Sequence, residues 1–246
     1  MPGRVALLIA LLATAGMVVA VPGLVPMPVR RLVGLAPHRL AEAPAVSGTG
    51  SFSYMAHQPG DPQTPVTYDP CRPVPVRVNP AGGPDGAVDL VRDALADVSR
   101  LTGLVLRYDG TSSERPHWDS AFVPSFLGLV RSRPVLVSWA TASEVPELAG
   151  DVAGVGGSVP LRRDDGVVRY LTGAVTLDAT TYADLAARPD GGPEMRAIVL
   201  HELGHVVGLG HVHDPAELMN ADNLGLLDFG PGDLEGLARV GSGSCG

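Results

Sequence analysis

One stretch of this sequence dominates the interpretation, and it reads His201-Glu202-Leu203-Gly204-His205-Val206-Val207-Gly208-Leu209-Gly210-His211. Apolar residues before and within it recur at helical spacing, which predicts a helix with one buried stripe formed by Met195, Val199, Leu203 and Val206. Pro193 suits the first helical position. Gly208 allows a left-handed turn that ends the helix, so the chain is expected to fold back before His211.

The histidines in this stretch have the spacing of metal ligands. His201 and His205 are four residues apart, so they lie on one helix face, one turn above the other. With His211 they predict a zinc ion held by three imidazoles. Such an ion keeps its fourth position open for a water and lowers the pKa of that water to about 7. Glu202 is placed to act as the general base.

A bare His-Glu-x-x-His can also be a pair of core histidines satisfied by hydrogen bonds alone. The additional Gly208 and His211 favour the metal site over that interpretation.

The complete pattern resembles the zinc-binding motif of the metzincin metallopeptidases, at His201, Glu202, His205, Gly208 and His211. The resemblance implies a methionine turn at Met219, eight residues past His211, as in matrixins. The segment 230–237 also resembles the last matrixin helix. The likeness covers residues from about 70 to 246, but it is specific only over 194–220.

Three departures limit the resemblance. Val212 stands where matrixins usually have Ser, and Asn220-Ala221 stands where they often have Tyr or Pro. No Asp-rich run resembles their structural zinc and calcium loops. The closest type is therefore a matrixin-like, secreted bacterial peptidase with one catalytic zinc ion.

The resemblance implies an α/β (α+β) fold: a metzincin-like catalytic domain with a twisted mixed sheet, a long helix before the sheet edge, an active-site helix and a C-terminal helix. It also places five residues where the clan's edge strand pairs with substrate: Ala153, Gly154, Val155, Gly156 and Gly157. Without the resemblance, the Gly-rich segment 142–158 is interpreted as a bulged connection. His213 is expected near the ligand loop or at the surface, not as a ligand.

Patterning outside the motif agrees with a mixed fold. Helical spacing of apolar residues begins after Pro84-Asp85-Gly86 and stops near Gly103. Asp164-Asp165-Gly166 is interpreted as a hairpin turn, and Asp109-Gly110 as the end of a strand. The expected strands are 74–78, with Pro75 near an edge or a strand start, and 104–107, 135–139, 159–161, 167–170 and 174–177.

Composition bounds the function. A chain of 246 residues with 45% hydrophobic residues can bury a sizeable core. Its net charge of −8 argues against nucleic acid and anionic membranes as partners. We expect a monomer that acts on a protein or peptide substrate.

The N-terminus is interpreted as an export signal. Arg4 precedes an uncharged run, and Val18-Val19-Ala20 offers a cleavage site, which predicts a signal peptide over 1–21 and a secreted, extracellular protein. The alternative is a signal anchor, because the uncharged run extends to Val29 and would tether the chain to the outer face of the membrane. Residues 22–65 are expected to form a Pro/Gly-rich linker or short pro-segment, and 66–246 the catalytic domain.

Two cysteines fit an exported protein. An even count in such a compartment predicts a disulfide between Cys71 and Cys245. The alternative is that Cys71 caps the zinc as a thiolate, as in the matrixin cysteine switch, although Asp69-Pro70-Cys71-Arg72-Pro73 resembles that motif only loosely.

The leading hypothesis is an exported zinc-dependent endopeptidase. The alternative is a catalytically inactive, zinc-containing binding module of the same fold. The intact Glu202 argues against the alternative, because a binding module does not need that carboxylate.

Overall fold

The protein is represented by a computed structural model that describes residues 37–45, 48–116, 125–126, 129–130, 133–163, 165–222 and 224–245. One compact unit spans Arg39–Gly246, so it begins before residue 66, the expected start of the catalytic domain. The expected signal segment 1–21 lies outside the described residues. None of the helices in the described part is both long and apolar enough to cross a membrane.

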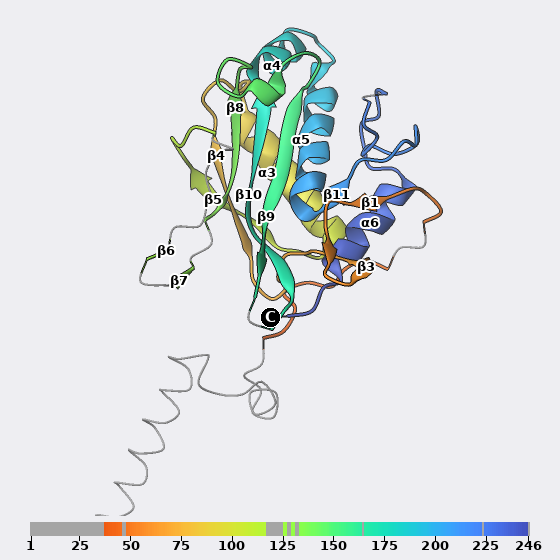
Figure 1. The fold of residues 1–246 in the computed structure, drawn as a ribbon. Coiled ribbons are helices and arrows are strands. Elements are labelled where there is room, and N and C mark those ends of the chain that lie inside the picture. Colours follow the sequence, from red (N-terminus) through yellow and green to blue (C-terminus); the bar gives the residue numbers. More distant parts are fainter. Residues whose placement is uncertain are drawn as a thin grey trace, which may run out of the picture. The chain divides into compact units, whose positions relative to one another are not determined.

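A five-stranded mixed sheet organises the unit (Figure 1). Its order is β5 (Leu106–Thr111), β4 (Val74–Asn79), β8 (Val135–Ala140), β10 (Val168–Asp178) and β9 (Gly154–Arg162). The first four strands are parallel, and β9 pairs antiparallel with β10. The Gly-rich segment is therefore an edge strand from Gly154 onward, and not the bulged connection that its composition indicates.

Several strand expectations differ in detail, and the expected strands 167–170 and 174–177 form one continuous strand, β10. Pro75 is the second residue of β4, an interior strand, so it marks a strand start and not an edge. Asp109-Gly110 does not end β5, which continues to Thr111. The pairing register with β4 shifts between Val76 and Val78, so that β5 has one extra residue there. Gly110 has a φ of 93°, a conformation open to glycine, so the strand continues through a bulge.

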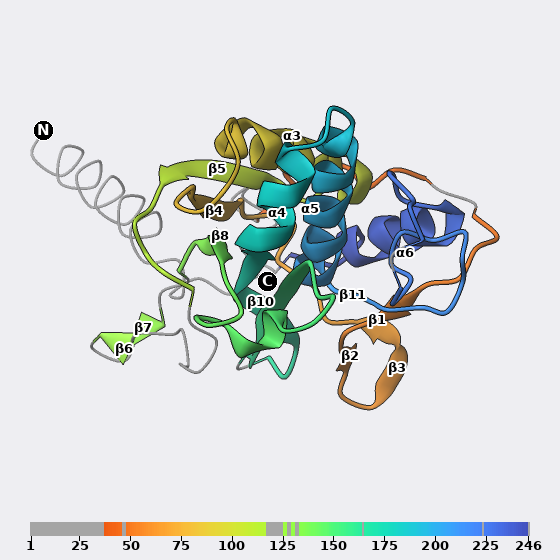
Figure 2. The same cartoon turned by 90° about the horizontal axis from the view of Figure 1, so that it is seen from above.

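Helices α3 (Ala87–Thr102) and α5 (Gly191–Val207) lie side by side against one face of the sheet (Figures 1 and 2). Helix α4 (Ala179–Ala186) connects β10 to α5, and α6 (Pro231–Gly241) packs near the end of α3. A short helix, η2 (Pro146–Leu148), precedes β9. Four α-helices and a mixed sheet confirm the predicted α+β class.

The two long helices share the core with the sheet. Helix α3 buries Val91, Leu95 and Val98, which recur at helical spacing, and it ends before Gly103, which has a left-handed conformation. Helix α5 begins at Gly191, two residues before the expected Pro193. Its Val199, Leu203 and Val206 are completely buried, whereas Met195, expected in the same stripe, is only half-buried.

Three two-stranded pairings complete the described strands. They are β1 (Ser53–Tyr54) with β11 (Leu209–Gly210), β2 (His57–Gln58) with β3 (Asp61–Pro65), and β6 (Ser125–Phe126) with β7 (Leu129–Val130). The first pairing brings the N-terminal part of the unit beside the end of α5.

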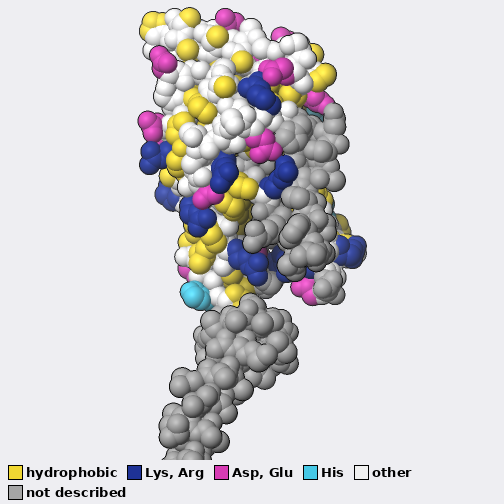
Figure 3. Space-filling view, turned by 90° about the vertical axis from the view of Figure 1, so that its left-hand side faces the viewer, with side chains coloured by type: hydrophobic (Ala, Val, Ile, Leu, Met, Phe, Trp, Pro, Cys, Tyr) yellow, Lys and Arg dark blue, Asp and Glu magenta, His cyan; other side chains and the backbone are white. Residues whose placement is uncertain are grey.

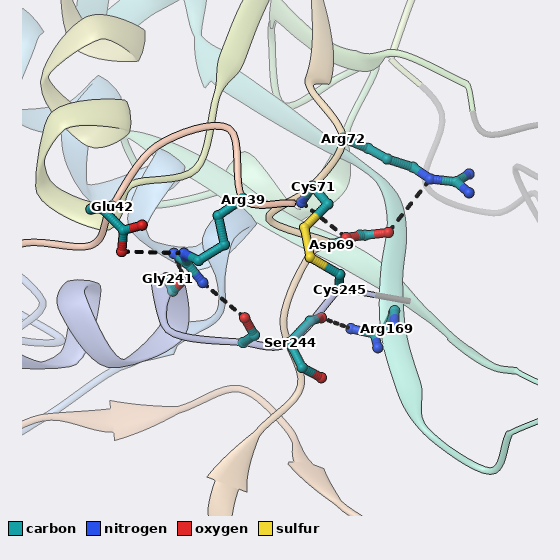
Figure 4. The surroundings of a disulfide bond; sticks show 10 residues. Arg39, Glu42, Asp69, Cys71, Arg72, Arg169, Gly241, Ser244 and Cys245 are labelled. Carbon is teal, nitrogen blue, oxygen red and sulfur yellow. Dashed lines mark hydrogen bonds and ion pairs between the residues drawn. A yellow bond between two sulfur atoms is a disulfide. The ribbon is translucent and has the colours of Figure 1, made fainter. Parts of the chain in front are cut away.

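The predicted disulfide joins Cys71 to Cys245 near the start of β4 (Figure 4). Arg39 secures the same end of the chain by donating hydrogen bonds to the carbonyl oxygens of Gly241 and Gly243, at 2.6 and 2.8 Å. Arg169 donates to the carbonyl of Ser244 at 2.8 Å. Because Cys71 is paired, it does not serve as a thiolate cap over the histidines.

Candidate functional site

Two histidines of the site are held by helix α5. The Nδ1 atom of His201 lies 2.8 Å from the carbonyl oxygen of Leu218, and Nδ1 of His205 lies 2.8 Å from that of Leu209. A carbonyl only accepts, so in each ring Nδ1 carries the proton and Nε2 keeps a lone pair. Both rings are thus fixed in the tautomer that presents Nε2.

The third histidine follows the turn that ends α5. Gly208 has a φ of 119°, which favours glycine, and a Cβ there would lie 3.1 Å from Tyr170 Cε2 and 3.2 Å from the carbonyl oxygen of Val66. The chain then forms β11 and reaches His211, whose backbone carbonyl accepts a hydrogen bond from the Ser53 hydroxyl at 2.7 Å. A side chain at position 208 would therefore be disfavoured both by the positive φ and by the close neighbouring atoms.

The three rings converge through their Nε2 atoms. Nε2 of His211 lies 3.0 Å from Nε2 of His201 and 3.1 Å from Nε2 of His205. His211 has at most one proton at Nε2, so it cannot satisfy both lone pairs that face it. Bonds of ~2.0–2.1 Å to a tetrahedral zinc would place such nitrogens ~3.3 Å apart, close to the observed spacing. These residues therefore fit a zinc ion.

The protonation of these rings suits metal binding. Burial, together with the nearby His211, lowers the pKa of His201 to about 4. Burial and the neighbouring His201 lower the pKa of His205 to about 3. The pKa of the more exposed His211 is also lowered, mainly by burial. Neutral imidazole is the form that ligates a metal.

Met219 lies in the turn that follows the histidine loop. It is 1% exposed and packs on Gly204, where a Cβ would lie 2.6 Å from its sulfur. The turn that contains Met219 is closed by the amide of Asn220, which donates a hydrogen bond to the carbonyl oxygen of Glu217 at 3.1 Å. The turn thus places the Leu218 carbonyl that orients His201.

Sequence reasoning missed one support of this turn. The Asp233 carboxylate, on α6, accepts hydrogen bonds from the amides of Leu218 at 2.5 Å and Gly230 at 3.0 Å. Its position three residues after Gly230 is the acidic position of a helix capping box, and this signal could have identified it as a cap. The second bond, to the turn, depends on tertiary packing.

Glu202 is buried without a partner for one of its oxygens. The side chain is 5% exposed, and Oε2 has no hydrogen-bond partner in the described part of the chain. Burial raises the pKa of this carboxyl to about 8. A Cβ at Gly154 would lie 3.0 Å from Oε1, and one at Gly156 would lie 2.9 Å from Oε2. The two glycines therefore let β9 close directly over the carboxylate.

A cavity of about 500 Å³ contains this site. It is lined by His201, Glu202, His205 and His211, by Ala153, Gly154, Val155 and Gly156 along β9, and by Leu218, Asn220 and Ala221 after the histidine loop. Gly157, expected with the β9 group, is buried and does not line it. His213 is exposed and lies outside the histidine group. Met219 does not line the cavity.

The comparisons with known proteins add little. No protein-family model matches the chain, and no curated protein matches it. Among solved structures it is similar to a chain described as "GM1 bound form of the ECX AB5 holotoxin", at 13% identity and a TM-score of 0.43, over 81% of this chain and 93% of that one. A TM-score this low does not establish a shared fold.

Proposed function

We propose that this protein is an exported zinc-dependent endopeptidase of the metzincin type, similar to matrixins, which acts as a monomer on protein or peptide substrates. One observation carries the proposal. Three imidazole Nε2 atoms converge in a cavity that also contains a buried carboxylate oxygen with no partner among the described residues. The disulfide agrees with an oxidising compartment and hence with export.

Different residues would have different roles in peptide hydrolysis. His201, His205 and His211 would hold the zinc, and the carbonyls of Leu218 and Leu209 keep two of the rings in the ligating tautomer. When bound, zinc supplies Lewis-acid activation of water and of the scissile carbonyl. Glu202 takes the proton of the attacking water at Oε2 and delivers it to the leaving amine nitrogen.

The substrate backbone would lie along β9. This strand is the edge of the sheet, so its outer side offers unpaired amides and carbonyls to an extended peptide. Gly154 and Gly156 keep this strand close to Glu202, so a peptide that pairs with β9 lies beside the carboxylate.

A single substitution tests the enzyme proposal. Glu202→Gln keeps the shape of the side chain but removes the base, so we expect unchanged zinc content and at least a ~100-fold loss in cleavage of an unfolded protein. Glu194→Gln is the matched control, because Glu194 lies on the same helix and pairs with Arg188 away from the cavity. Zinc is measured by elemental analysis and cleavage by peptide mass spectrometry, with and without a chelator.

Each outcome separates the two functional hypotheses. A parent protein that binds zinc and cleaves nothing across a broad peptide library would make it a binding module. Cleavage that survives both the chelator and Glu202→Gln would contradict the zinc mechanism.

A further inference from the structure

The cavity that contains the histidines has an acidic rim. Glu147 and Asp151 contribute exposed carboxylates from the segment before β9, and Asp222 contributes one from the loop after Met219. In the described structure no arginine lines this cavity or pairs with any of the three. The buried Glu202, which also lines it, has a partnerless oxygen.

Acidic side chains elsewhere are commonly paired. Glu144, Asp97 and Glu235 each contact an arginine. The face seen in Figure 3 carries both arginine and acidic side chains. The exposed carboxylates of Glu147, Asp151 and Asp222 therefore form a local negative charge at the rim that no described arginine pairs with.

The same rim carries exposed apolar side chains. The described residues include five large hydrophobic side chains that are exposed, and three of them line this cavity: Met55 at 52%, Val152 at 37% and Leu224 at 55%. Exposed apolar residues gathered around a cavity mark a binding site more than scattered ones do. Buried Ile198 and Leu218 extend the apolar lining inward.

These features specify the chemistry of the ligand. We infer that the cavity binds extended peptide segments in which basic side chains flank a large apolar one, so that the enzyme prefers cationic, apolar-containing substrates. The apolar side chain enters the cavity, the backbone pairs with β9, and lysine or arginine side chains reach the carboxylates of Glu147, Asp151 and Asp222. This inference rests on the proposed peptidase function and adds its substrate class.

The expected preference is moderate. Exposed ion pairs are weak and are screened by salt, so we expect about a two- to threefold effect for each carboxylate and roughly tenfold for the three together. The preference should decrease as ionic strength rises, because the charges lie at the surface.

Three synthetic peptides test the inference. They share one apolar centre and one length, and they carry Lys, Gln or Glu at the flanking positions. We expect the zinc-loaded parent to cleave the Lys peptide with a kcat/KM roughly tenfold above that of the Glu peptide at low salt. Binding to Glu202→Gln, followed by fluorescence anisotropy, should rank the peptides in the same order without turnover.

A paired set of variants assigns the preference to the rim. The double variant Glu147→Gln with Asp151→Asn should reduce the Lys-to-Glu ratio by about fivefold. The matched control is Asp85→Asn with Asp93→Asn, which removes the same charge from exposed positions outside the cavity and should keep the ratio.

The failures of the two proposals are distinguishable. If the parent cleaves all three peptides equally, or both double variants change the ratio equally, the inference is wrong and the peptidase remains. If no peptide is cleaved, the enzyme proposal fails, and the anisotropy ranking still decides whether the cavity selects basic peptides.

Discussion

The site combines histidines from two regions that are held in different ways: two from a helix and one from a loop. His201 and His205 belong to α5, and their positions follow from helix geometry and core packing. His211 is exposed, and its position depends on the turn at Gly208 and on β1, which is more than 150 residues earlier in the chain. A site of this kind requires both a folded core and a correctly placed N-terminal segment.

The largest expected effect is on zinc affinity, when one histidine from each region is replaced. His205→Ala and His211→Ala each remove a ligand, so both should lower zinc affinity by at least about a hundredfold. In the metal-free proteins only His205→Ala should lower the free energy of unfolding, by about 1–3 kcal/mol, because it leaves the Leu209 carbonyl unpaired in a buried position.

Zinc competition titrations and chemical denaturation provide the two measurements. Metal-free His211→Ala should stay within about 0.5 kcal/mol of the parent. If His211→Ala keeps stoichiometric zinc, the ligand set is wrong and the neighbouring His213 must be tested.

A smaller effect is expected at the junction of the two regions. Gly208→Ala forces a side chain into a conformation with φ of 119° and against Tyr170, so the free energy of unfolding should fall by about 1–3 kcal/mol. Zinc affinity should fall as well, because His211 follows this turn directly. Gly192→Ala is the control on the same helix, since its Cβ meets nothing within 4 Å and its φ is not positive. Equal stability of the two variants would show that the turn is not strained.

The smallest effect tests the N-terminal segment. Ser53→Ala removes one hydrogen bond to the His211 carbonyl and should weaken zinc binding two- to tenfold, since a single bond contributes about 0.5–1.5 kcal/mol. Ser51→Ala, which loses a bond to Asp214 instead, should bind zinc like the parent. If both serine variants match the parent in zinc titrations, β1 does not position His211.

The helical region could be predicted from sequence, whereas the segments that depend on distant contacts could not. Helices α3 and α5 could be predicted because local periodicity determines which residues are buried. Only the end of β9, at 159–161, could be predicted from local sequence; its Gly-rich start could not, because those glycines are explained by the closeness of Glu202, a tertiary contact. The segment around Ser53 shows no periodicity, and its place depends on pairing with β11. Asp233 could be recognised as a cap but not as a support of the turn.

The disulfide between Cys71 and Cys245 has a topological consequence. It closes a covalent ring over a sequence separation of 174 residues, which includes α5 and the histidine loop. A single backbone cut in any loop of this ring releases no fragment, because both pieces stay joined through the sulfur atoms. A molecule cut once within this ring would therefore stay one covalent piece until a reductant opens the disulfide.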